Sequence, residues 1–466
     1  MAIRPSNNTI TEPARKTTVF READVVVVGG GPGGVGAALA AARNGADTVL
    51  IERYGYLGGM ATGGLVIAIP VMSDIYGKRL LGGICWEWIE RLDKWDAADY
   101  PKEDELGSNN KVLVDYWQDR SFFTIRQGMV VLSAMIDHEI LKCLLNEMVQ
   151  EAGVETIFHS WGTEAVVEGD EVKGAIFESK SGRQAILGKV VIDSTGDGDL
   201  FPSARAEFDD NIDPKLRIKQ LSLEFFMGNV DAKRAQDFRG AQPEKHAELM
   251  NELEKLGGFP GRGLMFLKTG LKDQDNFVLF DCRYNVSSQT DIRELTRIEF
   301  TARKNILTTY AFYKKHVPGF EHCHLAFSAP QLGTRGARRV HGEYMLTEKD
   351  MASNEAFEDT VAVFPDLDRG EASARHPHMY IPYRCLVPKK VENLLVGCRA
   401  FSSDDITNNY FNLIPHCIAI GEAAGTAAAM AVKAGIKPRN VDYTALQARL
   451  LGQGVLLPGI EAKVKH

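Results

Sequence analysis

The sequence of 466 residues is poor in cysteine and contains no cysteine motif. Its seven cysteines are scattered, and no two stand at a C-x-x-C, C-x-x-x-x-C or zinc-type spacing. This argues against a disulfide framework, an iron–sulfur cluster and a redox disulfide, and we expect reduced thiols. The stretch Glu321-His322-Cys323-His324 carries ligand-type side chains but has no partner cluster, so we expect no metal site.

A surplus of positive charge is also missing. The 54 Lys and Arg residues are outnumbered by 62 Asp and Glu, which gives a formal net charge of -8. This balance gives no basis for nucleic-acid binding, RNA modification included, or for attraction to an anionic membrane. No uninterrupted apolar stretch is long enough to span a membrane, and residues 1–21 lack the apolar core of a signal peptide. We therefore expect a cytoplasmic protein with no nucleic-acid or membrane partner.

The most informative stretch that is present covers residues 24–52. A β-branched apolar run over residues 24–28 predicts a buried parallel strand, and an Ala-rich segment over residues 35–44 predicts a helix. Between them lie three glycines in G-x-G-x-x-G register: Gly29, Gly31 and Gly34. A second strand is expected over residues 48–51, and Glu52 follows it.

Each part of this pattern suits a dinucleotide. Gly29 permits a tight turn, Gly31 leaves room for a pyrophosphate at the backbone, and Gly34 lets helix and strand pack closely. The helix N-terminus offers free N–H groups and a positive dipole to the phosphates. Glu52 can accept hydrogen bonds from both ribose hydroxyls, and its charge would repel a 2′-phosphate. The order of strand, turn, helix, strand and acid therefore predicts a dinucleotide-binding fold.

The whole chain is expected to be an α/β protein in which a second domain is inserted into the first. Residues 1–22 are interpreted as a loose polar arm, and strands with turn signals over residues 163–193 predict a β-meander that ends in a Thr195-Gly196-Asp197 turn. Long helices are expected at residues 231–256, 291–315 and 415–434. The expected dinucleotide-binding domain is Rossmann-like and comprises residues 23–205, with an insertion at about 65–120, and residues 385–466. Residues 206–384 are expected to form an inserted α+β substrate or cap domain.

With these parts in order, the sequence resembles the FAD-dependent oxidoreductase family, whose fold is of the glutathione-reductase type with two dinucleotide-binding domains. Within it, the sequence is similar to a subgroup distantly related to the fumarate reductase and succinate dehydrogenase flavoproteins. The resemblance covers most of the chain and rests on the stretch that ends in Glu52 and on five further blocks. The blocks are Leu57-Gly58-Gly59-Met60-Ala61-Thr62, Ile192-Asp193-Ser194-Thr195-Gly196-Asp197-Gly198-Asp199, Gln331-Leu332-Gly333-Thr334-Arg335, Ile381-Pro382-Tyr383-Arg384-Cys385-Leu386 with Asn393-Leu394-Leu395-Val396-Gly397, and Gly421-Glu422-Ala423-Ala424-Gly425-Thr426.

The resemblance implies FAD as the cofactor and assigns residues to it. A helix that begins near His416 would point its N–H groups at the pyrimidine end of the flavin. The residues implied as FAD-binding are Gly29, Gly31, Pro32, Gly33, Gly34, Glu52, Arg53, Gly58, Gly59, Met60, Thr62, Thr195, Gly196, Asp197, Arg399, Ile414 and Pro415.

The sequence departs from the family pattern in three places. Cys398-Arg399 replaces the usual glycine–aspartate pair whose acid holds the ribityl chain, so Arg399 or the Asp404-Asp405 pair would take over that contact. No histidine lies in residues 57–64, where the fumarate reductase type attaches flavin covalently, and we expect noncovalent FAD. The loop over residues 404–412 differs from the His- and Arg-bearing loop of the subgroup, which leaves the substrate class open.

The first hypothesis for function is oxidation of a small organic substrate by hydride transfer to flavin N5, with electrons passed on to oxygen or a carrier. No second dinucleotide fingerprint follows a strand elsewhere, which disfavours a self-contained pyridine-nucleotide disulfide reductase. A flavin reductase or monooxygenase-like enzyme is one alternative, since external NAD(P)H could reduce the flavin without a second dinucleotide-binding domain. A flavoprotein subunit that transfers electrons within a complex is another. The oligomeric state is left open.

Five residues are candidates for the chemistry on the substrate: His376, His378, Arg384, Tyr410 and His416. Each histidine is weighed against a structural role, and Arg384 against an ion pair between domains. Tyr410 and His416 flank the turn into the helix expected at the flavin. A basic group, Arg335, Arg338 and Arg339, could grip an anionic substrate, but we favour a solvated or interdomain cluster.

Overall fold

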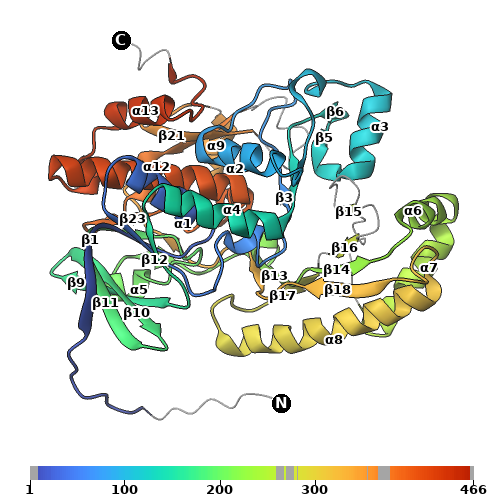
Figure 1. Ribbon diagram of the computed structural model, residues 1–466, viewed down its shortest axis with the longest axis horizontal. Coiled ribbons are helices and arrows are strands. Elements are labelled where there is room, and N and C mark those ends of the chain that lie inside the picture. The colour runs from blue at the N-terminus through green and yellow to red at the C-terminus, as the bar shows by residue number, and fades with distance from the viewer. Residues whose placement is uncertain are drawn as a thin grey trace.

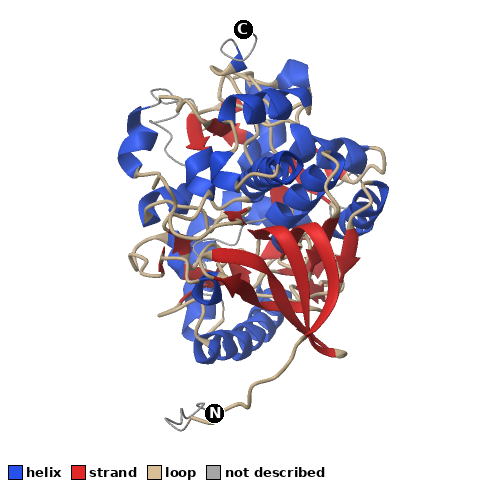
Figure 2. Cartoon of the chain, turned by 90° about the vertical axis from the view of Figure 1, so that its left-hand side faces the viewer, coloured by secondary structure: helices blue, strands red, loops and turns tan. Residues whose placement is uncertain are grey.

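The computed structural model describes residues 9–258, 267–268, 278–280, 282–353, 355–365 and 378–461 (Figure 1). Its central feature is a seven-stranded sheet in the order β8-β2-β1-β11-β10-β9, with β23 paired to β11. The strands are β8 (Glu155–Ile157), β2 (Thr48–Ile51), β1 (Thr18–Val28), β11 (Gly182–Asp193), β10 (Glu171–Ser179), β9 (Trp161–Glu168) and β23 (Leu394–Val396). Figure 2 shows the twisted strands with helices stacked above them.

The sheet combines a parallel half with an antiparallel half. β1 pairs in parallel with β2 and β11, and β8 and β23 extend this parallel part. β9, β10 and β11 form the antiparallel meander. The fold predicted from the sequence is therefore confirmed, with β11 belonging to both halves.

The first strand is longer than the sequence predicts. β1 begins at Thr18, which pairs with Gln184 of β11, so the arm expected over residues 1–22 is wrong from Thr18 onward. The reason is tertiary, because the twelve-residue β11 supplies a pairing edge for the residues before Ala23.

Two helices pack on the parallel half at unusually short range. They are α1 (Pro32–Arg43) and α12 (Ile414–Ala434), and the second confirms the helix expected over residues 415–434. A Cβ added to Gly421 would lie 2.0 Å from the carbonyl oxygen of Gly33, and one on Gly425 would lie 2.1 Å from that of Ala37. Only glycine at these positions allows the two backbones to come so close.

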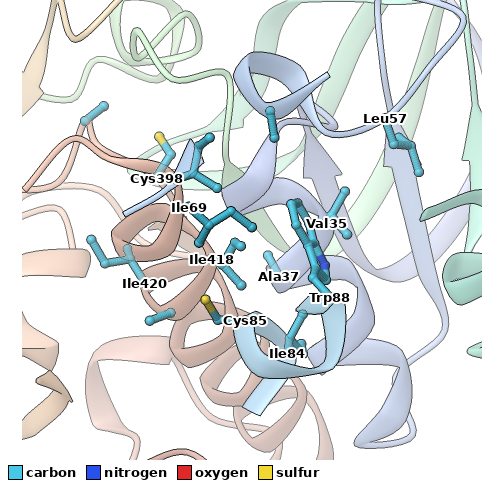
Figure 3. Packing of buried hydrophobic residues seen from close by; sticks show 14 of the residues in the cluster. Val35, Ala37, Leu57, Ile69, Ile84, Cys85, Trp88, Cys398, Ile418 and Ile420 are labelled. Carbon is cyan, nitrogen blue, oxygen red and sulfur yellow. The ribbon is translucent and has the colours of Figure 1, made fainter. Parts of the chain in front are cut away.

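A third helix completes this layer. It is α2 (Gly83–Asp93), whose Trp88 is fully buried, and Figure 3 shows its ring between α1 and α12, near Val35 and Ile418. By length and composition α12 could cross a membrane, but 78% of the relevant window is buried inside the molecule. It is the core helix of this layer.

Besides two two-stranded sheets, the described residues between 206 and 384 form two larger sheets and three main helices. The larger sheets are β17-β13-β19 and β15-β16-β14-β18. Their strands are β13 (Gln220–Ser222), β17 (Arg283–Asn285), β19 (Gly333–Thr334), β14 (Phe225–Gly228), β15 (Leu267–Lys268), β16 (Val278–Phe280) and β18 (His324–Ser328). The helices are α6 (Ala232–Ala241), α7 (Pro243–Lys255) and α8 (Ile292–His316). In Figure 1, α8 runs along one side of the β14–β18 sheet.

The long helix expected over residues 231–256 is two helices in the structure. Gln242, at φ -134°, ends α6 and precedes Pro243, the first residue of α7. A proline disfavours the helical conformation for the residue before it and lacks an N–H for the preceding turn, and both effects break the helix here. The helix expected over residues 291–315 matches α8.

The remaining described elements are mostly short helices and short strands. The helices are η1 (Gly59–Ala61), η2 (Glu103–Glu105), α3 (Lys111–Arg120), η3 (Phe122–Thr124), α4 (His138–Glu151), α5 (Phe201–Ala204), η4 (Arg217–Lys219), α9 (Glu348–Ser353), η5 (Tyr383–Leu386), α11 (Asp405–Tyr410), η6 (Pro438–Asn440) and α13 (Tyr443–Gly452). The strands are β3 (Ala68–Ile69), β4 (Ala98–Asp99), β5 (Ile125–Arg126), β6 (Met129–Val130), β7 (Ala134–Ile136), β12 (Phe208–Asp209), β20 (Arg339–Val340), β21 (Thr360–Phe364) and β22 (Met379–Pro382).

Candidate active site

A first cavity of about 730 Å³ opens where the parallel strands end. This is the edge at which open α/β sheets bind their ligands. The predicted residues that line it are Gly29, Gly31, Pro32, Gly33, Glu52, Arg53, Gly59, Met60, Thr195, Gly196, Asp197 and Arg399. The structure thus brings together residues from three distant stretches of the chain.

The glycine turn leaves space on the cavity side. Gly29 has φ +96°, which favours glycine, and a Cβ on Gly34 would lie 1.7 Å from the carbonyl oxygen of Gly29. Gly31 is different: its backbone is extended at φ -68°, and no atom lies within 4 Å of the Cβ position. Packing therefore does not demand glycine at residue 31, whereas the close approach of a ligand to the N-terminus of α1 does.

Glu52 lines the first cavity beside the glycine turn. Its carboxylate accepts hydrogen bonds from the backbone N–H of Gly30 at 2.6 Å and of Tyr54 at 2.7 Å. Burial raises the pKa of Glu52, and these two hydrogen bonds act in the opposite direction. The two bonds hold the carboxylate beside the glycine turn, where a ribose would lie.

Asp193 at the end of β11 shapes the opposite wall. This fully buried carboxylate accepts hydrogen bonds from the N–H and the hydroxyl of Thr195, at 3.0 and 2.8 Å, and from the N–H of Leu200 at 3.0 Å. The turn that carries Gly196 and Asp197 is thereby fixed to the sheet. Burial raises the pKa of Asp193.

Arg399 lies over this turn and is 8% exposed. One terminal nitrogen of its guanidinium donates to Asp197 Oδ1 at 3.0 Å, while Nε is buried and has no partner among the described residues. Burial lowers the pKa of Arg399, but Asp197 and neighbouring groups outweigh it, so the group stays charged. A buried donor without a partner next to an open cavity fits an anionic or hydroxyl-bearing ligand.

The structure separates the alternatives for the ribityl contact. Asp404 caps α11 by accepting from the N–H of Thr407 at 2.7 Å, and Asp405 accepts from the N–H of Asp213 at 3.0 Å. Neither residue lines the first cavity, whereas Arg399 does. Arg399 is therefore the one of the three that is placed for the contact.

Five predicted FAD residues do not line the first cavity. Gly34 and Pro415 pack in the helices, and Ile414 faces a second cavity described below. Gly58 and Thr62 shape the loop after Glu52: the N–H of Gly58 donates to the carbonyl of Gly30 at 2.8 Å, and the hydroxyl of Thr62 donates to that of Leu57 at 2.6 Å.

Several lining residues were not predicted. They are Val28, Ile51, Tyr54, Ser160, Trp161, Gly162, Ser194, Asp199, Gln331, Thr334, Cys398 and Cys417. Gln331, Thr334 and Asp199 lie within the blocks that carry the family resemblance, so a signal existed for them. Trp161 starts β9 and had no such signal. Burial and the charge of Asp197 raise the pKa of Asp199 to about 6.

A second cavity of about 1210 Å³ adjoins the first, and Met60 and Thr334 line both. Its further lining residues are Val66, Ala68, Pro70, Val71, Phe123, Arg126, Arg217, Ser222, Glu224, Arg283, Gly333, Arg335, Asn412, Leu413 and Ile414. It lies between the cap sheet β17-β13-β19, the insertion and the start of α12. The arrangement gives a partly open space for a second molecule beside the first cavity.

None of the candidate catalytic residues in the described part of the chain lines either cavity. His376 is outside the described residues. Arg384 donates to Asp359 through Nε at 3.0 Å and through a terminal nitrogen at 3.1 Å, which raises the pKa of Arg384. Arg384 thus makes an ion pair, as in the structural alternative considered for it. A role for Arg384 in substrate binding stays a prediction.

His378 faces a carboxylate. Its Nε2 is 3.5 Å from Asp74 Oδ2. Burial raises the pKa of Asp74, but hydrogen bonds from His378 and from the N–H groups of Lys78 and Tyr76 outweigh it, and that pKa lies below its usual value. Neither His378 nor Asp74 lines a described cavity wall.

His416 is fully buried in the first turn of α12, and Tyr410 is half-buried at the end of α11. The Nδ1 of His416 accepts from the N–H of Leu413 at 3.3 Å, and its ring packs edge-on against Phe364 and Phe411. Burial lowers the pKa of His416 to about 3. The ring is therefore a neutral capping group, and proton transfer by His416 or Tyr410 stays a prediction.

Taken as a class, this is the site of a dinucleotide-binding flavoprotein, and its residues fit FAD. The open space at Gly31, the ribose acid Glu52 and the unpartnered Nε of Arg399 lie along one cavity. Residues 24–450 match the family described as FAD dependent oxidoreductase. The chain belongs to this family and is an FAD-dependent oxidoreductase.

The chain is also similar to individual proteins and solved structures. The chain is 29% identical over 209 residues to a digeranylgeranylglycerophospholipid reductase of Methanoculleus marisnigri, covering 45% of this chain and 46% of that protein. The chain spans less than half the length of the curated relatives it matches. A geranylgeranyl bacteriochlorophyll reductase-like structure from Thermoplasma acidophilum aligns with TM-score 0.43 and 14% identity over 93% of this chain and 83% of that one. A flavin-dependent brominase aligns with TM-score 0.46 and 12% identity over 92% and 83%.

Proposed function

We propose that this enzyme oxidises a small organic substrate held in the second cavity, by hydride transfer to the flavin, with electrons passed on to oxygen or a carrier. The observation that carries the proposal is the junction of the two cavities at Met60 and Thr334, beside the start of α12. When bound, FAD supplies the hydride acceptor, and the protein supplies position and electrostatics. The cap over residues 206–384 is proposed as the substrate domain.

The protein's own residues divide the work between the two cavities. Gly31, Glu52 and Arg399 hold and orient the cofactor. Leu413 and Ile414, at the start of α12, bring the positive end of that helix to the junction. There the helix dipole stabilises negative charge that develops during reduction. The apolar residues Val66 and Val71 limit the access of water to the second cavity.

Glu224 is proposed as the group that takes the substrate proton. Among the described residues that line the second cavity it is the one carboxylate, and it is 7% exposed. A two-electron oxidation at carbon needs a base for the accompanying proton, and a carboxylate within reach of the substrate can serve as that base. Sequence reasoning missed Glu224 because no motif surrounds it.

The test is an anaerobic titration of the purified enzyme, loaded with FAD, against a panel of organic metabolites and against NADH and NADPH. Bleaching of the visible flavin band by one organic metabolite supports the proposal. Glu224→Gln should slow this bleaching about 100-fold or more, because removal of a general base costs two or more orders of magnitude. Glu254→Gln, on the exposed face of α7, is the matched control and should bleach at the wild-type rate.

Bleaching by NAD(P)H alone would overturn the direction of the reaction and favour a reductase. That second candidate is supported by the curated relatives, which are digeranylgeranylglycerophospholipid reductases and match less than half of the chain. The noncovalent attachment of FAD and the kinship with fumarate reductase flavoproteins stay proposals. Release of the flavin into the supernatant on acid precipitation would support noncovalent attachment.

A further inference from the structure

Four arginines converge on the second cavity from four separate segments. Arg126 ends β5, Arg217 begins η4, Arg283 begins β17 and Arg335 follows β19. All four are half-buried. Glu224 is the one acidic side chain among the described residues that line the same space.

The cap sheet brings two of these arginines to the same wall. Ser222 of β13 pairs with Arg283 on one side and with Gly333 on the other. Arg335 lies two residues after Gly333 and donates to Asn412 Oδ1 at 3.5 Å, next to the start of α12. Arg217 is anchored on the same side, because it donates to the carbonyl of Asn409 at 2.9 Å.

Part of the remaining wall of the second cavity is apolar. Val66, Ala68 and Val71 come from the segment after η1, and Leu413 and Ile414 from the start of α12. A ligand of this space therefore meets guanidinium groups on one part of its surface and aliphatic side chains on another. The polar side chains of Ser222, Glu224, Thr334 and Asn412 line the same space.

We propose that the substrate is a small organic acid that carries at least two anionic groups, carboxylate or phosphate, joined by a hydrocarbon part. Guanidinium groups bind both kinds of anion through paired N–H donors, and in a half-buried space such bonds are stronger than in water. Two anionic groups held by arginines from different segments would fix the carbon between them next to the junction with the first cavity. The inference rests on the proposed function only in taking the second cavity as the substrate site.

Binding without turnover tests this class of substrate directly. The dissociation constants of succinate, phosphoglycolate, butyrate and succinamide for the FAD-loaded enzyme are measured by calorimetry and by perturbation of the flavin spectrum. Succinate or phosphoglycolate should bind at least 10-fold more tightly than butyrate, and succinamide should not bind measurably. Preference for succinate identifies carboxylates and preference for phosphoglycolate identifies a phosphate. Equal binding of all four compounds, or binding of none, would overturn the inference.

Arginine variants locate the binding. Arg126→Gln and Arg283→Gln should each weaken binding of the preferred dianion about 10- to 100-fold, as expected for loss of a charge-assisted hydrogen bond, and leave FAD content unchanged. Arg335→Lys should bind more tightly than Arg335→Gln, since it keeps the charge. Arg297→Gln, on the exposed surface of α8, is the matched control and should bind as the wild type does. Unchanged dianion binding in all the cavity variants would overturn the inference.

These results also separate the inference from the proposed function. An enzyme that binds succinate or phosphoglycolate through the cavity arginines but whose flavin is bleached only by NAD(P)H would retain the anionic substrate class and lose the direction of the reaction. If a neutral metabolite bleaches the flavin, the proposed oxidation is supported and the proposed dianionic substrate class is overturned.

Discussion

Glu422, in the middle of α12, accepts a hydrogen bond from the backbone N–H of Ile84 at 3.0 Å, in the first turn of α2. A carboxyl group there caps the N-terminus of a neighbouring helix from inside the core. Glu422 is 2% exposed, and burial raises its pKa to about 8. The group is therefore neutral in the folded protein at pH values where it would be charged in the unfolded chain.

The first prediction concerns the pH dependence of stability. Because the folded state holds the proton of Glu422 up to about pH 8, the stability this group contributes is full below its unfolded pKa of 4.5 and is lost as pH rises through about 8. Glu422→Gln should flatten this decline, by on the order of 5 kcal/mol across the window. Urea unfolding of the apoprotein at several pH values measures the free energy of unfolding of both proteins. A wild-type decline that persists in Glu422→Gln would assign it to another group.

The second prediction compares two glycines. Gly421→Ala should destabilise the protein by about 2 kcal/mol or more, because its new methyl group would meet the carbonyl of Gly33 at 2.0 Å. Gly31→Ala should leave the stability of the apoprotein nearly unchanged, since no atom lies within 4 Å of that Cβ position. Its FAD affinity should fall about 10-fold or more, because the methyl group enters the space of the pyrophosphate. Thermal unfolding and flavin fluorescence measure the two effects, and wild-type FAD affinity in Gly31→Ala would contradict the placement of the cofactor.

The third prediction tests Arg399 as the residue that replaces the family's acid. Arg399→Lys keeps the ion pair with Asp197 but loses the planar fork and the free Nε donor. FAD affinity should fall about 10-fold, the effect of one lost charge-assisted hydrogen bond. Arg338→Lys is the matched control, because Arg338 contacts the same turn and lines neither cavity. Equal losses in both variants would mean that the turn, and not the guanidinium, sets the affinity.

The fourth prediction separates two roles of Arg384. Removal of this side chain leaves the buried carboxylate of Asp359 without its ion pair. Because Arg384 itself is half-exposed, Arg384→Gln should cost only about 1 to 2 kcal/mol of stability. If the ion pair is its whole role, KM and kcat stay at wild-type values below the melting temperature. A rise in KM with unchanged stability would instead place Arg384 at the substrate.

The fifth prediction concerns His416. Its folded pKa of about 3 lies below its ordinary value of 6.5, so the stability it contributes is present above pH 6.5 and is lost as pH falls toward 3. His416→Gln keeps an acceptor for the N–H of Leu413 and removes the titration, as in a helix capping box. The acid limb of the stability profile should become shallower by on the order of 5 kcal/mol. An unchanged acid limb would show that His416 is charged in the folded state.

The sequence was most informative where structure is local. From β1 to Glu52 each part lies next to the following one in the chain, so spacing alone predicted strand, turn, helix and acid. Arg399 could be named as an alternative because it occupies a family position. The choice between Arg399 and the Asp404-Asp405 pair required the geometry of the turn around Asp197.

The second cavity could not be predicted in the same way. Arg126, Arg217 and Arg283 belong to segments that lie far apart in the chain, and none has a motif around it. Arg335 was noticed but interpreted as part of a basic cluster, because its distance to α12 cannot be derived from composition. Pro243 did carry a signal, since proline favours the first turn of a helix. It marks the break between α6 and α7 that the prediction of one long helix did not include.

The junction of the two cavities has a consequence for how such enzymes diversify. Among the described residues, Met60 and Thr334 are shared, and every other lining residue serves one cavity alone. Mutations that change the side chains lining the second cavity therefore leave the glycine turn, Glu52 and Arg399 unchanged. Related enzymes can therefore evolve new substrate specificity through substitutions in the second cavity, while the residues of the first cavity stay the same.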